Sequence, residues 1–172
     1  MLTIISGTNR PGSNTLKIAR YYASALTGLG VENQLLTLEE LPADFLRTDL
    51  YGKRSPVFQG LLDQYMIPVQ KFAVFVPEYN GSFPGVFKLF IDAVQPEHFR
   101  GKKMGLIGVS AGRAGNLRGL DDLTNAFHYL KMNVYHHKIP VSQVRNLVSA
   151  DELTDAATQK LLGEHAAAFS DY

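Results

Sequence analysis

The feature that most constrains the fold is a continuous apolar run, Phe72-Ala73-Val74-Phe75-Val76. A strand with one face in water alternates apolar and polar residues, whereas this run is apolar at every position. It is therefore typical of a strand that is covered on both faces. Met104 to Val109 is a second buried strand pattern, and Leu2 to Ser6 begins the chain in the same manner.

Segments with the period of a helix separate these apolar runs. The clearest one repeats apolar residues at spacings of three and four from Leu16 to Leu26, and Gly28 and Gly30 end it. Further helices are expected at Val57 to Val69, Val86 to Val94, Leu117 to Leu130 and, after a capping box of Ser149 and Glu152, from Asp151 to about Phe169. Weaker strands are expected at Gln34 to Leu38 and Asn133 to His137, and a loop of unassigned role at Leu41 to Ser55.

Strands that alternate with helices five times predict an α/β fold, in which one parallel sheet carries helices on both faces. The 172 residues suit one domain, and no repeat, linker or low-complexity tract divides residues 1–172. In such folds ligands bind beyond the carboxyl ends of the strands, near the point where the strand order reverses. The loops after the first, third and fourth strands are therefore the expected functional positions.

Composition and charge exclude several classes of function. The chain has 17 Lys and Arg against 16 Asp and Glu, and these basic residues do not cluster as nucleic-acid binding would require. The absence of cysteine excludes disulfides, thiolate catalysis and cysteine-bound iron–sulfur clusters. No apolar run reaches the ~18 residues of a membrane span, and the first strand pattern starts at Leu2. We expect a cytoplasmic protein with no signal peptide and no membrane segment.

The five histidines do not indicate a metal site. His136 and His137 are adjacent, so on a strand their side chains would point to opposite faces of the sheet. We expect His98 and His165 to lie at the surface.

The first loop, "SGTNRPGSNT", consists almost entirely of turn formers and short polar side chains. A turn of this kind before a helix lets unpaired N–H groups converge on an anion. Hydroxyls, an amide and a guanidinium suited to phosphate come from Thr8, Ser13, Thr15, Asn14 and Arg10. The glycine spacing fits neither the dinucleotide fingerprint nor Walker A, which favours a phosphate monoester. An ordinary polar turn with Ser13 or Asn14 as N-cap explains this loop alone equally well.

The second loop, "PEYNGSFPG", spans residues 77–85 and follows the third strand. Pro77 and Pro84 bracket it, and Tyr79 and Phe83 supply flat apolar surface. A rigid loop of this composition suits a planar heteroaromatic ring, although an Asn-Gly turn beside core aromatics has the same pattern. Its expected position beside the first loop favours the binding interpretation.

These two motifs together carry a resemblance to a known family. Gly7 to Ser13, followed about sixty-five residues later by Pro77-Glu78-Tyr79-Asn80-Gly81-Ser82, Pro84-Gly85 and Lys88 through Asp92, resembles the NAD(P)H-dependent FMN reductases, which are flavodoxin-like proteins. The resemblance covers nearly the whole chain in length and element order. It implies a three-layer sandwich with a five-stranded parallel sheet of order 2-1-3-4-5.

The resemblance also implies a set of cofactor ligands. The FMN phosphate would be held by Thr8, Arg10, Ser13, Asn14 and Thr15, and the ring and ribityl chain by Pro77, Glu78, Tyr79, Asn80 and Ser82. Four positions depart from the family pattern. Thr8 replaces a usual Ser, Thr15 a frequent Asn, and Leu89 and Ala93 replace an Asn and a Trp in a helix that often contributes to a dimer interface.

The third loop contains the sharpest competing motif. Gly108-Val109-Ser110-Ala111-Gly112 matches the G-x-S-x-G elbow of serine hydrolases, with Asp121 or Asp122 and His136 or His137 following in the order of a triad. Against this interpretation, no oxyanion segment lies upstream, and Arg113 to Asn116 delays the helix that an elbow requires at once. In the flavin interpretation Ser110 and Gly112 belong to a small-residue loop at the edge of the ring.

The activity that the resemblance implies is that of an NAD(P)H-dependent FMN-containing oxidoreductase. NADPH or NADH would pass hydride to FMN, and a flavin, quinone, azo compound or similar small acceptor would then be reduced, with no side chain needed as a catalytic acid or base. The alternatives are a serine hydrolase using Ser110 and a flavodoxin-like electron carrier, although such carriers are usually strongly acidic. The very apolar segment Val86 to Val94 suggests a homodimer or homotetramer.

Overall fold

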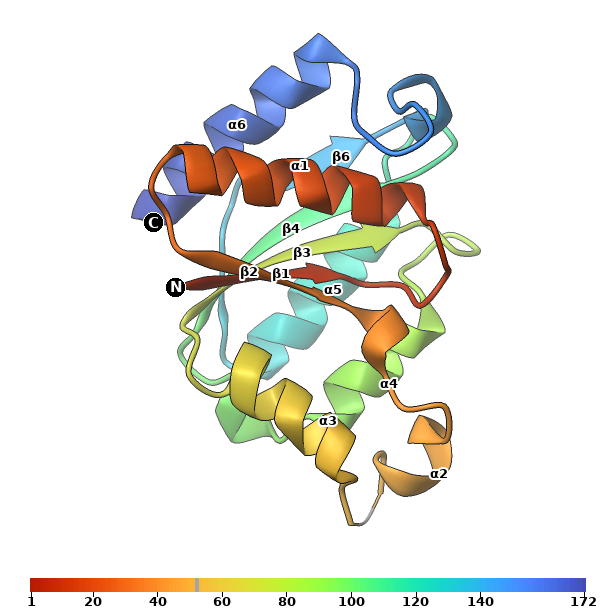
Figure 1. Cartoon of the computed structure of the whole chain (residues 1–172), viewed down its shortest axis with the longest axis vertical. Helices are drawn as coiled ribbons and strands as arrows, with labels where there is room; N and C mark the ends of the chain where they lie inside the picture. Colours follow the sequence, from red (N-terminus) through yellow and green to blue (C-terminus); the bar gives the residue numbers. More distant parts are fainter. Residues whose placement is uncertain (52) are drawn as a thin grey trace.

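A twisted parallel sheet lies between two layers of helices in the computed structural model, which describes residues 1–51 and 53–172 (Figure 1). Within these residues the sheet has six strands: β1 (Leu2–Ser6), β2 (Asn33–Thr37), β3 (Lys71–Pro77), β4 (Lys103–Val109), β5 (Asn133–Val134) and β6 (Ile139–Val141). The order is β2-β1-β3-β4-β5, and β6 also pairs with β4. Each of these pairings is parallel, which confirms the predicted fold.

The helices divide between the two faces of the sheet. On one face lie α1 (Asn14–Gly28) and α6 (Ala156–Asp171), and on the other α3 (Pro56–Leu61), α4 (Gly85–Ala93) and α5 (Leu117–Tyr129) (Figure 1). Shorter helical elements are α2 (Phe45–Thr48), η1 (Leu38–Glu40), η2 (Leu62–Met66), η3 (Pro96–His98) and η4 (Val144–Asn146). Strand β3 is buried from Phe72 to Val76 because both helical layers cover it.

Several predicted elements require correction. The predicted strand Asn133 to His137 is only two residues long in β5, and pairing with β4 resumes at β6, so the sheet has a sixth strand. The predicted helix Val57 to Val69 is the short α3 followed by the π-helical turn η2. The predicted loop Leu41 to Ser55 contains α2.

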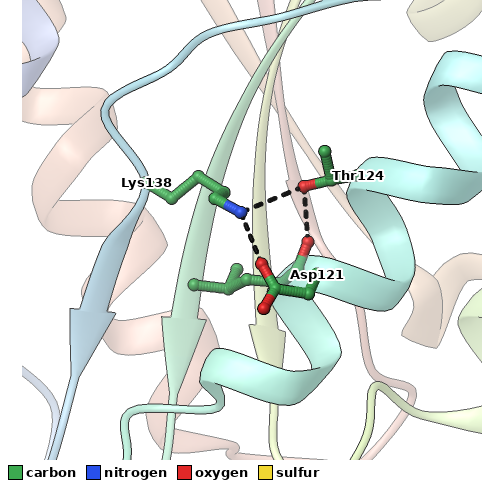
Figure 2. Close-up of polar contacts among 4 residues, drawn as sticks. Asp121, Thr124 and Lys138 are labelled. Carbon is green, nitrogen blue, oxygen red and sulfur yellow. Dashed lines mark hydrogen bonds and ion pairs between the residues drawn. The ribbon is translucent and has the colours of Figure 1, made fainter.

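The interruption between β5 and β6 is held against α5. Tyr135 is 8% exposed and packs on aromatic side chains of α6, whereas His136 and His137 face solvent. Figure 2 shows Lys138 reaching across to α5, where its Nζ lies 2.6 Å from Asp121 Oδ1 and donates to Thr124 Oγ1 at 3.4 Å. The Tyr135 N–H still donates to the Met104 carbonyl of β4 at 2.8 Å, so pairing is interrupted only beyond Tyr135, where the Lys138 ion pair holds the segment to α5.

The start of α6 also differs from the prediction. The helix begins at Ala156, and its N-cap is Asp155, whose carboxylate accepts from the Thr158 N–H at 2.8 Å. Ser149 and Glu152 instead form a backbone bond in the turn before the helix. The predicted capping box was therefore wrong, because a turn with its own hydrogen bonds precedes the helix.

Most of the apolar side chains of α4 pack in the core of the protein. Phe87, Phe90, Ile91 and Ala93 are buried against the sheet and neighbouring helices. The sequence argument for a dimer contact along Val86 to Val94 therefore loses most of its support, and the oligomeric state stays a prediction. Within residues 1–51 and 53–172, no helix combines the length and the apolarity needed to span a bilayer.

His165 is buried rather than exposed, contrary to the sequence prediction. It is 1% exposed in α6, where its Nδ1 lies 2.9 Å from the Tyr22 hydroxyl of α1 and its Nε2 lies 3.1 Å from the His137 carbonyl. Burial lowers the pKa of His165 to about 4, and it raises the pKa of Tyr22. Both groups are therefore neutral at pH 7, and together they join α1 to α6.

Stability should fall as the pH drops below the ordinary histidine pKa of ~6.5. Because the folded-state pKa of His165 is about 4, the unfolded chain binds a proton that the folded chain excludes between these two values. Between pH 7 and pH 5 the free energy of unfolding should decrease by about 2 kcal/mol from this group alone. Urea denaturation at both pH values measures the decrease.

The variant His165→Gln separates this contribution from that of other acidic and basic groups. Its free energy of unfolding should be lower than that of the original chain at pH 7. Between pH 7 and pH 5 that free energy should decrease by about 2 kcal/mol less than in the original chain. His98→Gln, at a half-buried position outside this cluster, serves as the matched substitution for comparison. An equal pH dependence in His165→Gln and the original chain would contradict the assignment.

Candidate functional site

The carboxyl ends of β1, β3 and β4 meet at one edge of the sheet, where their loops enclose a cleft of about 240 Å³. Eight of the predicted site residues line it: Arg10, Ser13, Asn14, Thr15, Pro77, Glu78, Tyr79 and Ser110. Four others, Thr8, Asn80, Ser82 and Gly112, lie in the same loops but do not line the cleft. The cleft also includes Val144 and Arg145 of η4, which no sequence motif indicated.

A larger groove of about 450 Å³ lies beside this cleft, between η1, α2 and α4. Pro11 of the first loop lines both of them. The groove is lined mainly by apolar side chains, including Leu38, Phe45 and Leu89. The smaller cleft carries the hydroxyls, amides and guanidinium groups, so it is the one suited to an anion.

The first loop turns sharply against β3. The Gly7 N–H donates to the Phe75 carbonyl at 2.8 Å, and a Cβ at Gly7 would lie only 2.7 Å from Val76 Cγ1. Only glycine fits this approach, because β3 is itself buried and cannot retreat. Beyond the turn, the Ser13 side chain accepts from the Leu16 N–H at 3.2 Å, so of the two predicted candidates, Ser13 and Asn14, Ser13 is the N-cap of α1.

The amino end of α1 is available to a ligand. The N–H groups in the first turn of a helix have no partner within that helix, and they carry a partial positive charge. Thr15 lies in this turn, lines the cleft and is only 2% exposed, and its hydroxyl makes no hydrogen bond within the described part of the chain. The hydroxyl oxygen itself is not fully enclosed, so it is available from the cleft to an acceptor supplied from outside the chain.

The second loop is a tight hairpin. Tyr79 and Ser82 exchange backbone hydrogen bonds at 2.9 and 3.2 Å around Asn80 and Gly81, both of which have positive φ, 52° and 82°. These are the angles of a type I′ turn, which explains the Asn-Gly pair. The Ser82 hydroxyl donates to Asp122 of α5 at 2.5 Å, so it fixes the hairpin and does not face the cleft.

A hydrogen bond joins the first and second loops. Thr8 is fully buried, and its hydroxyl lies 2.9 Å from the Tyr79 hydroxyl while it accepts from the Arg10 N–H at 3.3 Å. Thr8 therefore orients both loops from behind the cleft.

Ser110 does not have the surroundings of a nucleophile. It is 4% exposed, and its hydroxyl donates to the Gly112 carbonyl and accepts from the Gly115 N–H, each at 2.9 Å. Its described hydrogen-bond partners are these two backbone groups of its own loop, with no histidine among them. Asp121 pairs with Lys138 and Asp122 with Ser82, so neither completes a triad.

Asn116 is a structural determinant of the site that the sequence argument missed. It is 1% exposed with a φ of 63°, and its Nδ2 donates to the carbonyls of Val76 and Pro77 at 3.2 and 3.0 Å. These carbonyls end β3 immediately before the second loop. Asparagine tolerates the left-handed conformation, so one residue both starts α5 and holds the exit of β3.

Two arginines give the cleft its positive charge. Arg10 and Arg145 line it together with a single carboxylate, that of Glu78. The ion pairs in the described residues are Lys88–Asp92, Lys138–Asp121 and Lys160–Glu164, so neither arginine is engaged in one. The described residues contain no group of three or more His, Asp or Glu side chains that could hold a metal ion.

Known proteins were compared with this chain by sequence. A family model described as NADPH-dependent FMN reductase matches residues 1–145. An FMN-dependent NADPH-azoreductase from Staphylococcus aureus (strain NCTC 8325 / PS 47) is 28% identical over 116 residues, which are 63% of this chain and 60% of that protein. The alignment thus spans less than two thirds of the length of this curated relative.

Solved structures show the same fold. The flavoenzyme NAD(P)H:(acceptor) oxidoreductase FerB from Paracoccus denitrificans superposes with a TM-score of 0.79 at 23% identity, covering 99% of this chain and 95% of that one. An NADH:FMN oxidoreductase in its apo form superposes with a TM-score of 0.77 at 17% identity, covering 98% of this chain and 87% of that one. A Megasphaera elsdenii flavodoxin superposes with a TM-score of 0.59 at 18% identity, covering 98% of this chain and 99% of that one. The predicted flavodoxin-like architecture is therefore confirmed.

Replacing Asn116 tests its role at the exit of β3. Asn116→Gly keeps the left-handed backbone but removes both side-chain donors, so the free energy of unfolding should fall by about 1–3 kcal/mol. Asn116→Asp should have a still lower free energy of unfolding at pH 7, because a buried carboxylate would face two carbonyl oxygens. Since burial raises the pKa of that carboxyl, the Asp variant should regain stability relative to the Gly variant at pH 5. Urea denaturation that shows Asn116→Gly as stable as the original chain would contradict this role.

Proposed function

The chain belongs to the NADPH-dependent FMN reductase family, and on this premise we propose that it binds FMN in the cleft and passes electrons from NADPH or NADH to a small acceptor. The observation that carries the proposal is the anion-binding end of the cleft. Asn14 and Thr15 at the amino end of α1, the Thr15 hydroxyl and the Arg10 side chain line one cleft. These groups fit a phosphate monoester.

The second loop supplies the residues for the remainder of the cofactor. Pro77, Glu78 and Tyr79 line the cleft next to the first loop, and the Thr8–Tyr79 bond fixes their relation to it. We propose that these residues, with Asn80 of the hairpin, hold the ring and the ribityl chain. Ser82 acts through Asp122, so we place it among the residues that position the hairpin.

When bound, FMN supplies hydride acceptance from the nicotinamide and electron donation to the acceptor. The chain binds and orients it. The N–H groups of Tyr79, Ser82 and Gly115 are bonded within their own loops, so donors to negative charge on the ring would be the remaining N–H groups of the second and third loops, which these bonds help to position. Such donors replace a side-chain acid, and accordingly we assign no catalytic acid or base.

Quinones and azo compounds are the acceptors that we propose to test. The curated relative described above is an azoreductase, and the groove of about 450 Å³ beside the cleft offers apolar walls for an aromatic acceptor. The electron-carrier alternative has less support, because the net charge of +1 is unlike the strong negative charge usual in such carriers. A cytoplasmic location and a homodimeric or homotetrameric state stay predictions.

Titration of the flavin-free protein tests the cofactor. FMN should bind with the flavin absorption bands of a protein-held ring near ~450 nm, and tighter than riboflavin, which lacks the phosphate. Oxidation of NADPH or NADH with a benzoquinone or an azo dye should then require added FMN. If FMN in excess is not taken up, the proposed function is wrong.

Arg10→Ala tests the first loop directly. Loss of one charge-assisted hydrogen bond to phosphate should weaken FMN binding by about tenfold or more, measured by quenching of flavin fluorescence. Arg100→Ala removes another exposed charge, just before the amino end of β4, and should leave FMN affinity unchanged. Equal FMN affinity in the Arg10 variant and the original chain would remove Arg10 from the site.

A further inference from the structure

Arg145 lies in η4, outside the three loops that the motifs identified, yet it lines the cleft. The chain reaches this position from β6, which runs to the carboxyl edge of the sheet (Figure 1). Arg145 therefore belongs to the segment after β6, whereas Arg10 belongs to the loop after β1.

The segment that carries Arg145 is fastened to the third loop. The Gln143 N–H donates to the Gly112 carbonyl at 2.8 Å, and the Val144 N–H donates to the Ser110 carbonyl at 3.0 Å. Val144 is 4% exposed, and Gln143 has a φ of 51°, which turns the chain into η4. The backbone of Arg145 is therefore fixed relative to the end of β4, while its guanidinium is free to reach a ligand.

The cleft already contains neutral groups for an anion but only one other cation. Ser13 and Thr15 are both more than nine-tenths buried, and the Thr15 hydroxyl has no partner within the described residues. A phosphate monoester near pH 7 carries close to two negative charges and three acceptor oxygens. Glu78, the single carboxylate in the lining, opposes such a ligand, and a second guanidinium offsets the charge of that carboxylate.

We propose that Arg145 is a second cationic ligand of the phosphate monoester in this cleft, acting opposite Arg10. The inference rests on the proposed function, because FMN and NADPH both carry a phosphate monoester. Arg145 lines the same cleft as Ser13, Asn14 and Thr15 of the first loop, so we assign it to the group that this loop is proposed to hold, which is the phosphate of FMN. The anion is then held between the first loop and the segment after β6.

The affinity ratio of FMN to riboflavin isolates this contribution, because the two ligands differ only in the phosphate. In Arg145→Gln, the dissociation constant for FMN should rise by about tenfold, and that for riboflavin should stay within about twofold. Arg145→Lys keeps the charge and should show a smaller increase for FMN. Arg100→Gln, the charge-matched control, should change neither constant.

Three outcomes would overturn the assignment. Equal weakening of FMN and riboflavin in Arg145→Gln would mean that the residue supports the ring or the fold. Unchanged FMN affinity together with a raised KM for NADPH, but not for NADH, would assign Arg145 to the nicotinamide cofactor. Unchanged values throughout would leave it outside the site. Failure of the original chain to bind FMN is a separate result, which contradicts the proposed function itself.

Discussion

Parallel pairing of β1 with β3 is the constraint on which the site depends. The chain leaves β1 toward β2 on one side and returns to β3 on the other, so the order reverses between β1 and β3. The connections of the two strands lie on opposite faces, which leaves a crevice at their carboxyl ends. The register places Ser6 beside Phe75 and Pro77 beside Val109, so three loops start within a few residues of one another along this edge.

Most of the fold and the candidate site could be predicted because their signals are local. The run from Phe72 to Val76 is recognisable as buried from its own residues. The composition of the turn before α1 similarly indicates an N-cap there. The Asn80-Gly81 pair similarly specifies its own turn. Because parallel strands end at a common edge, these local features were enough to bring eight predicted residues to one cleft.

The features that escaped prediction depend on partners distant in the sequence. His165 is buried where Tyr22, 143 residues earlier, provides a hydrogen bond and a tilted aromatic contact. The split of the last strand depends on Tyr135 packing against α6. Arg145 has no motif of its own, because its position follows from backbone bonds between η4 and the third loop. A pattern in the local sequence contains none of this information.

The Thr8–Tyr79 hydrogen bond links the two halves of the proposed cofactor site. A bond between two neutral hydroxyls contributes only about 1 kcal/mol, and Tyr79 is 37% exposed, so this contact alone does not make the second loop rigid. Two further attachments act on this loop, because Ser82 bonds the hairpin to α5 and Asn116 holds the end of β3. Thr8 therefore adds a contact that directs the Tyr79 ring, and together these three attachments join the two parts of the proposed cofactor site.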